Sequence, residues 1–232
     1  MASGPHHPAL RAAKRRWRCI GASRVMSESR SPSGTVVVAC FTPGTLIATP
    51  RGEVAVEELA VGDRVITRDN GIQPIRWISR RRLDHALLLA HPHLRPVLVE
   101  KGSLGQDLPD RDMMVSPNHR LLVTRDRTQI HFDEPEALVA AKHLVGPRGI
   151  REVDCGGTTY IHVMFDRHEV VLANGAWCES FQPTERLIHG MGNAQRTELL
   201  ELFPSLRSSD GLAAFGRARP VLVPDREAAL VR

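Results

Sequence analysis

The chain has 232 residues, of which 42% are hydrophobic and 25% are charged, a composition typical of a globular domain with one sizeable core. The sequence has no run of about 18 apolar residues, the length that a membrane-spanning helix needs, so we expect no membrane span. The net charge is +5, but residues 1–30 hold seven basic residues and one acidic residue. The rest of the chain has 24 basic and 25 acidic residues and is nearly neutral. The basic character therefore belongs to the N-terminus.

The N-terminal residues 1–34 are predicted to form a disordered basic arm that ends in the polar linker SESRSPSG (27–34). The alternative is that translation starts at Met26. No apolar stretch follows the charges, so the arm does not read as a secretory signal. The segment AAKRRWR (12–18) matches no recognisable nucleic-acid-binding module, and we expect no nucleic acid partner.

Residues 35–184 consist of short strand-like runs separated by turn residues, which predicts a mainly β domain. The sequence DNG (69–71) is a strong hairpin signal because Asn and Gly tolerate positive φ. The segment PEALVAAKHL (135–144) is predicted as a short helix within this domain. The predicted strands are TVVVA (35–39), TLIAT (45–49), GDRVIT (62–67), IQPIRWIS (72–79), RPVLVE (95–100), MMVS (113–116), HRLLVT (119–124), TTYIHVMF (158–165) and a closing pair within HEVVLANGAWCESF (168–181), which contains the Asn174-Gly175 turn.

The C-terminal residues 185–232 are predicted to form a partly helical tail, because AQRTELLELF (194–203) has helical periodicity. Charged residues are spread throughout this tail. The predicted fold class is therefore mainly β with a small helical C-terminal tail.

The four cysteines, Cys19, Cys40, Cys155 and Cys178, include no CxxC pair, so neither a zinc site nor a disulfide framework is indicated. Free thiols favour a reducing, cytoplasmic location. A metal site built from His85, His91 and His93 is an alternative, but no Cys or carboxylate completes a ligand spacing, and solvated loop histidines are the favoured interpretation. We expect no metal and no other cofactor.

Cys40 ends an apolar run and is followed by the turn TPG (42–44). Such a cysteine can simply fill a gap in the core. It can also attack the carbonyl of the residue before it, which requires a base for the thiol proton, hydrogen bonds that activate the amide, and an acid for the departing amine. A Ser three residues before a His in a turn between strands, as in SPNH (116–119), can present both side chains to one peptide bond. The product would be a thioester between Ala39 and the Cys40 sulfur.

Three sequence blocks follow one another along the chain: CFTPGTLIAT (40–49) with ELAVGDRV (58–65), then VSPNHRLLV (115–123), then HEVVLANGAWCES (168–180). Together they resemble the blocks of Hint domains, which are shared by inteins and hedgehog autoprocessing domains. The run DNGIQPIRW (69–77) is similar to the bacterial hedgehog/intein-like subgroup. The resemblance covers roughly residues 36–183.

This resemblance implies a compact, horseshoe-like β fold with pseudo-twofold symmetry and an N-to-S acyl shift at the bond between Ala39 and Cys40. Cys40 would be the nucleophile. His119 would assist through the scissile amide, and Ser116, which replaces the usual Thr, would hydrogen-bond nearby. His168 or His162 would be a second proton donor, and the sequence leaves the choice between them open.

The ending departs from that of inteins, which finish with His-Asn and cyclise the Asn side chain. Glu179 and Ser180 occupy the corresponding positions, and serine cannot form a succinimide. The sequence therefore predicts single-turnover cleavage without splicing, with the protein's own N-terminal segment as substrate and water or a small thiol as acceptor. The alternative is a non-catalytic, β-rich structural or interaction module.

Overall fold

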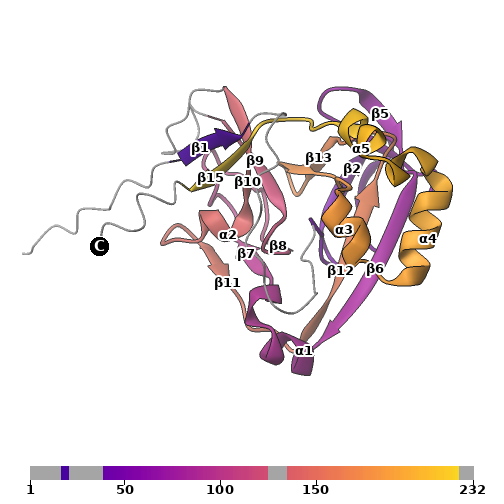
Figure 1. Ribbon diagram of the computed structural model, residues 1–232. Coiled ribbons are helices and arrows are strands. Elements are labelled where there is room, and N and C mark those ends of the chain that lie inside the picture. Colours follow the sequence, from indigo (N-terminus) through magenta and orange to yellow (C-terminus); the bar gives the residue numbers. More distant parts are fainter. Residues whose placement is uncertain (1–16, 21–38, 125–134, 225–232) are drawn as a thin grey trace, which may run out of the picture.

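The computed structural model describes residues 17–20, 39–124 and 135–224 (Figure 1). The predicted strand at residues 35–39 lies almost wholly outside the described residues. The strands are β1 (Trp17–Ile20), β2 (Leu46–Thr49), β3 (Gly52–Ala55), β4 (Arg64–Thr67), β5 (Gly71–Pro74), β6 (Trp77–Asp84), β7 (Val97–Val99), β8 (Met113–Val115), β9 (Arg120–Thr124), β10 (Glu136–Ala140), β11 (Ile150–Glu152), β12 (Gly157–Met164), β13 (Val170–Ala173), β14 (Ala176–Glu179) and β15 (Val221–Pro224).

The helices are short and lie mostly at the C-terminal end of the chain, so the predicted mainly β fold is confirmed. Within the β body they are α1 (His85–Ala90), the 3-10 turn η1 (Pro92–Leu94) and α2 (Ala141–Leu144). After it come α3 (Glu185–Gly190), α4 (Asn193–Leu202), η2 (Pro204–Arg207) and α5 (Ser209–Phe215). None of the helices in the described ranges is long and apolar enough to cross a membrane.

The strands form one large sheet and two smaller ones. The large sheet has the order β1-β15-β10-β9-β14-β13-β2-β3, with β4 joined to β13 and β5 joined to β4. The small sheets are β11-β7-β8 and the long pair β12-β6. Figure 1 shows β6 and β12 running side by side down one flank of the molecule toward α1.

Two tight turns that the sequence predicts are present. The turn at residues 69–71 joins β4 to β5, with Thr67 opposite Gly71. Asn174 and Gly175 adopt positive φ angles of 46° and 75° and join β13 to β14. The Asn174 side chain also accepts the N–H of Leu46 at 2.8 Å, so it ties this hairpin to β2.

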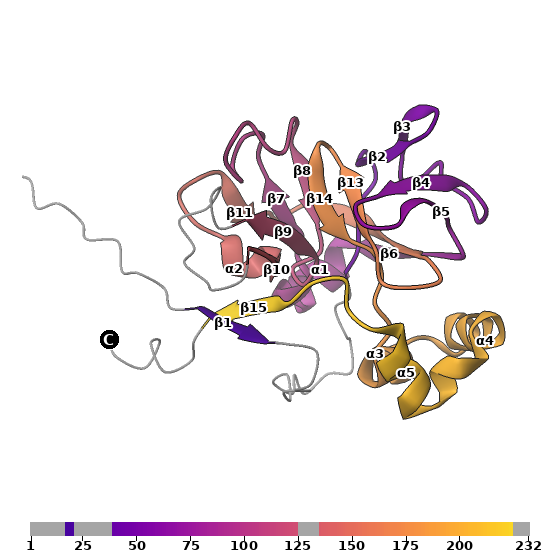
Figure 2. The same ribbon diagram turned by 90° about the horizontal axis from the view of Figure 1, so that it is seen from above.

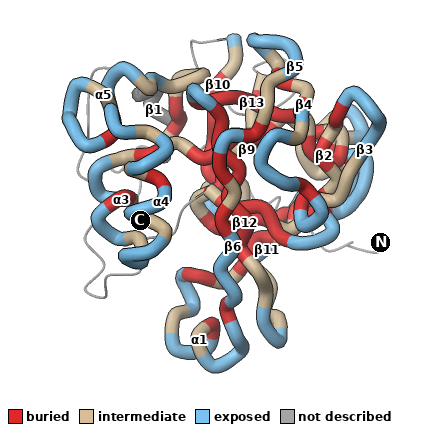
Figure 3. Tube along the Cα trace, turned by 90° about the vertical axis from the view of Figure 1, so that its right-hand side faces the viewer, coloured by how far each residue is buried: buried red, intermediate tan, exposed pale blue. Residues whose placement is uncertain are grey.

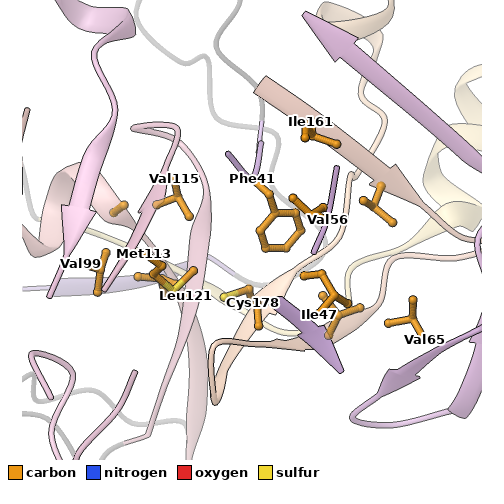
Figure 4. Close-up of a cluster of buried hydrophobic side chains, with 14 of the residues drawn as sticks. Phe41, Ile47, Val56, Val65, Val99, Met113, Val115, Leu121, Ile161 and Cys178 are labelled. Atoms are coloured by element: carbon orange, nitrogen blue, oxygen red, sulfur yellow. The ribbon is translucent and has the colours of Figure 1, made fainter. Parts of the chain in front are cut away.

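The main core lies where these sheets face one another. Phe41 is buried among side chains of the sheets, including Val56, Ile161 and Cys178, as Figure 4 shows. Burying one such aromatic side chain contributes about 2–3 kcal/mol to the free energy of unfolding. The burial map in Figure 3 places the buried residues along the central strands, whereas the α1 region projects from the body and is largely exposed. The residue next to Cys40 is thus anchored in the centre of the protein.

Two predictions inside the body are wrong. The segment 135–144 was predicted as a helix, but it forms β10 and only one helical turn, α2. The reason is that β10 lies between β9 and β15 and buries four consecutive residues, so a continuous apolar run reads equally well as helix or strand. The single strand predicted over 72–79 is interrupted between Pro74 and Trp77.

The two ends of the described chain also differ from the prediction. Trp17–Ile20, placed in the disordered arm, forms β1 and pairs antiparallel with β15. β15 in turn runs parallel to β10, so the tail predicted at 185–232 is not only helical but returns to the large sheet. Both strands are completed by pairing between distant segments, which local sequence does not encode. The remainder of the arm, residues 1–16 and 21–34, lies outside the described residues.

Candidate functional site

Phe41 fixes the position of Cys40. The backbone N–H and C=O of Phe41 both pair with Ile161 of β12 at 2.9 Å, and Phe41 also forms a bridge with Val115 at the end of β8. Its side chain is held in the core. The bond between Ala39 and Cys40 therefore lies at the junction between β12 and the turn that follows β8.

Ser116 contacts this bond from the β8 side. Its Oγ accepts the N–H of Cys40 at 3.0 Å, and its own N–H donates to the Cys40 carbonyl at 3.0 Å. Ser116 is 0% exposed and Cys40 is 2% exposed. The amide nitrogen of the junction is thus paired with a hydroxyl in a site that is closed to bulk water.

His162 on β12 contacts the same bond from the other side. Its Nδ1 lies 3.2 Å from the Ala39 carbonyl oxygen and 3.5 Å from the Cys40 sulfur, and its Nε2 lies 3.8 Å from the sulfur. In the tautomer protonated at Nε2, Nδ1 is free to accept the thiol proton. Once protonated, the same nitrogen can donate to the carbonyl oxygen. One imidazole atom therefore faces both the nucleophile and the oxygen on which charge would develop.

The imidazole of His162 is held neutral by its surroundings. Burial lowers its pKa to about 4, against the contact with the Ala39 carbonyl, which raises it, while the charge of Arg81 lowers it further. The ring stacks on Trp77 with centroids 6.1 Å apart and meets the edge of Phe181 at 5.3 Å. A neutral imidazole in an apolar setting is able to act as a base toward the thiol.

His119 lies in the same turn as Ser116, and its N–H donates to the Ser116 carbonyl at 3.0 Å. Its ring is 0% exposed and packs against Phe41 with centroids 4.5 Å apart. Neither ring nitrogen has a hydrogen-bond partner among the described residues. Burial lowers the pKa of His119 to about 4, Glu179 raises it, and Arg120 and His162 lower it further.

The turn at residues 116–119 is anchored by its neighbours. The short helix α2 begins against it, with the N–H of Ala141 donating to the His119 carbonyl at 2.9 Å and the N–H of Lys142 donating to the Pro117 carbonyl at 3.0 Å. These are two of the N–H groups that lack intrahelical partners at a helix start. The region predicted as a longer helix thus holds the turn with its first residues.

His168 is placed away from the junction. Its Nδ1 accepts the N–H of Ala218 at 3.0 Å, and its Nε2 lies 3.4 Å from Oε2 of Glu179, longer than an ordinary hydrogen bond. The structure therefore brings Cys40, Ser116 and His162 together and separates His168 from them. His119 adjoins this group through Phe41 and the turn.

The buried Glu179 and the partly buried Arg120 form an ion pair that sequence reasoning missed. Oε1 of Glu179 accepts the backbone N–H of Arg120 at 2.8 Å, and Oε2 accepts its guanidinium at 2.9 Å. Burial raises the pKa of the Glu179 carboxyl, but Arg120, His168 and His119 lower it more strongly, to about 2. The sequence did offer a signal for this ion pair: Glu179 ends an apolar strand, and a glutamate buried at such a position needs a charged partner.

The other cysteines whose side chains are described differ from Cys40. Cys178 is fully buried in the main core, where burial raises the pKa of its thiol, and Cys155 is half-buried at the edge of the cluster that contains Cys40. Within the described ranges no group of three or more His, Cys, Asp or Glu side chains is arranged to hold a metal ion. The rings of His91 and His93 do contact each other, with centroids 5.7 Å apart.

Comparisons with known proteins identify the family of this chain. The sequence matches the Hint domain family over residues 39–185, so the chain belongs to the Hint domain family, and its domain is of the autoprocessing, intein-like type. A comparison with curated proteins found no match.

Several solved structures are similar to this chain. The solution structure of a bacterial intein-like domain from Clostridium thermocellum is 18% identical, with a TM-score of 0.40, and the match covers 62% of this chain and 98% of that one. The crystal structure of the MchDnaB-1 intein is 15% identical, with a TM-score of 0.37 and coverage of 60% and 98%. The Ssp DnaB mini-intein variant M86 is 10% identical, with a TM-score of 0.39 and coverage of 63% and 97%.

Proposed function

We propose that this Hint domain cleaves its own chain at the bond between Ala39 and Cys40, through a thioester formed by an N-to-S acyl shift. One observation carries the proposal. The amide nitrogen of that bond is held by Ser116, while its carbonyl oxygen and the Cys40 thiol are both within reach of one nitrogen of His162. Every atom that must exchange a proton or gain charge therefore faces a side chain that can serve it.

The first step is attack of the thiol on the Ala39 carbonyl carbon. Nδ1 of His162 takes the proton from the Cys40 sulfur, and the S–H bond breaks as the S–C bond forms. The resulting imidazolium then donates to the oxygen that has become negative. With a pKa of about 4, the ring of His162 is neutral at physiological pH, so Nδ1 can take the proton as the S–C bond forms.

The second step is loss of the amine. The C–N bond breaks, the proton taken from the thiol is returned to the Cys40 nitrogen, and a thioester and a free α-amine result. Ser116 Oγ lies 3.0 Å from this nitrogen, so its hydroxyl can give its proton to the departing amine and regain the proton first taken from the thiol. His119 is the second candidate acid, because its two ring nitrogens are uncommitted among the described residues and it is held in the same turn. His168 has no part in this scheme.

The end of the domain supports cleavage rather than splicing. Ser180 accepts the backbone N–H of Glu169 at 2.9 Å through its hydroxyl, and its own N–H donates to the Glu169 carbonyl at 2.8 Å. A serine has no amide to cyclise, so the second junction of a splicing reaction has no means of being cut. The thioester is resolved by water or a small thiol, which releases the N-terminal segment with a free or thiol-bound carboxyl group at Ala39.

The test is a fusion of a soluble reporter before residue 35, followed by intact mass with and without dithiothreitol or hydroxylamine. We expect cleavage after Ala39 that both reagents accelerate and that Cys40→Ala abolishes. Cys155→Ala is the matched control, because Cys155 packs at the edge of the cluster that contains Cys40 but its thiol has no hydrogen bond to the junction among the described contacts. This substitution should leave cleavage unchanged. A folded fusion that stays intact with both reagents would contradict the proposal and favour a non-catalytic Hint-fold module.

A further inference from the structure

The helices that follow the β body pack against the flank formed by β6 and β12. Figure 2 shows α3, α4 and α5 gathered at one side of the molecule next to β6. Their apolar residues form one buried cluster with three side chains of the β body, Trp77, Met164 and Phe181. The helical members of the cluster are Ile188, Leu199 and Leu206.

Two of these shared side chains are the rings that contact His162. Trp77 stacks on the imidazole at 6.1 Å, and Phe181 meets it edge-on at 5.3 Å. Trp77 and Phe181 also contact each other, with centroids 5.4 Å apart. A single layer of aromatic side chains therefore separates the helices from the imidazole that faces the junction.

A polar contact marks the same place from the helix side. The side-chain amide of Gln195, on α4, donates to the hydroxyl of Ser79 at 2.6 Å. Ser79 lies directly opposite His162 in the pairing of β6 with β12. α4 is thus joined to the strand position across from the imidazole, and His162 remains only 8% exposed.

We infer that residues 185–215 form a cover over the cleavage site. They pack on Trp77 and Phe181, which contact His162, and so limit the access of water and other acceptors to the bond between Ala39 and Cys40. This inference rests on the proposed function. All but the first of these residues lie beyond the match to the Hint family, which ends at residue 185. The cover is therefore built by residues outside the matched Hint domain.

The cover explains why the imidazole of His162 is neutral. Burial is the largest cause of the low pKa of His162. The charged or titratable groups that act on the ring or adjoin it are Arg81 on β6 and, on the junction side, Cys40 and His119. The charges carried by the helices are not among the causes of the shift, so the helices affect the ring through apolar cover.

The experiment uses the full chain with Leu199→Ala and the stronger Leu199→Asp, each designed to loosen α4 from Trp77. Arg196→Ala is the control, because Arg196 lies half-buried on the same helix, bonds through its side chain only to Asn193 among the described contacts and is not a member of the apolar cluster. Hydrogen exchange of the α4 amides reports whether the helix has loosened. The titration of His162 is followed by NMR in a Cys40→Ala background, and alkylation of Cys40 by iodoacetamide is followed in the reactive chain with Cys178 as internal reference for global unfolding.

With α4 loosened and Cys178 still protected, we expect the His162 pKa to rise by about one unit or more toward its ordinary value and Cys40 alkylation to accelerate by about tenfold or more. Arg196→Ala should change neither. An unchanged His162 pKa and alkylation rate in a variant whose α4 amides exchange freely would overturn the inference. If Leu199→Asp unfolds the whole chain, Leu199→Ala decides by the same measurements. Neither readout needs cleavage, so a failure of the proposed function is recognised separately.

Discussion

The carboxylate of Glu179 accepts the backbone N–H of Arg120 at 2.8 Å, and in this way the last strand of the Hint domain holds the residue that follows His119. A second oxygen of the same carboxylate binds the Arg120 guanidinium. The turn that carries Ser116 and His119 is therefore fixed at its start by Cys40 and at its end by Glu179.

Glu179→Gln is expected to destabilise the fold and to slow cleavage through the position of this turn. Removing one partner of a fully buried ion pair costs about 3–5 kcal/mol, but the Arg120 side chain is 21% exposed, so water can solvate part of its charge. Glutamine also keeps one acceptor for the Arg120 N–H, so we expect a loss of stability below that range. Denaturant unfolding at pH 7 measures it, and Glu198→Gln, exposed on α4, is the control.

The same carboxylate has a defined pH signature. The pKa of Glu179 is lowered from 4.5 to about 2 in the folded protein, so its contribution to stability is complete above pH 4.5 and is lost as the pH falls from 4.5 toward 2. The wild-type chain should lose stability in this window more steeply than Glu179→Gln. Equal slopes for the two chains would contradict the prediction.

Ser116→Ala is expected to slow thioester formation by about tenfold or more, because an activating hydrogen bond to the amide is lost. The buried Cys40 N–H also loses its acceptor, which costs about 1–3 kcal/mol of stability. Ser116→Thr retains a hydroxyl and is the matched variant that should preserve most of the rate. The measurement is the rate of hydroxylamine-dependent cleavage of the fusion, at a temperature where circular dichroism shows all chains folded.

The two histidines that sequence reasoning could not separate should behave differently. His162→Gln is expected to slow the acyl shift by about 10² or more, the contribution of a positioned acid–base group. His168→Gln removes a group that contacts Ala218 and Glu179 rather than the junction, so at a temperature where it is folded the rate should change by much less. Equal losses in the two variants would remove His162 from its proposed role.

His119→Ala is also expected to slow thioester formation by about 10² or more if His119 returns the proton to the departing amine. Its test is the same rate measurement, with stability followed in parallel because the ring is buried against Phe41. An unchanged rate would leave Ser116 as the group next to the amine.

The sequence was sufficient for the parts of this protein that local chemistry dictates. The turns at 69–71 and 174–175 follow from residues that tolerate positive φ, and the helical periodicity of 194–203 predicted α4 within one residue at each end. The strand β10 was not predictable in the same way. Its apolar residues have no decisive period, and only the neighbours β9 and β15 determine that the segment is extended.

The site shows the same division. Cys40 and the turn of Ser116 and His119 could be found because they are close in sequence or end a recognisable run. The choice of His162 over His168 depends on the register of β12 against β6 and on Phe41, which pairs with Ile161. The cover by α4 depends on how Trp77 and Leu199 meet across more than a hundred residues. Such contacts are set by tertiary packing.

The two buried imidazoles make the stability of the fold depend on pH. His119 and His162 each have a pKa of about 4 in the folded protein, below the ordinary value of 6.5. Between pH 6.5 and 4 the unfolded chain binds more protons than the folded one, so stability is complete above pH 6.5 and falls as the pH drops to 4. A shift of this size corresponds to about 3 kcal/mol for each histidine.

We therefore expect the free energy of unfolding to fall by several kcal/mol between pH 7 and pH 4, and the slope to be roughly halved in His119→Gln, because one of the two titrations is removed. Urea unfolding at half-unit pH intervals measures this. His189→Gln, exposed on α3, is the matched control and should leave the slope unchanged. A wild-type stability that is constant over this range would show that neither imidazole is held neutral by burial.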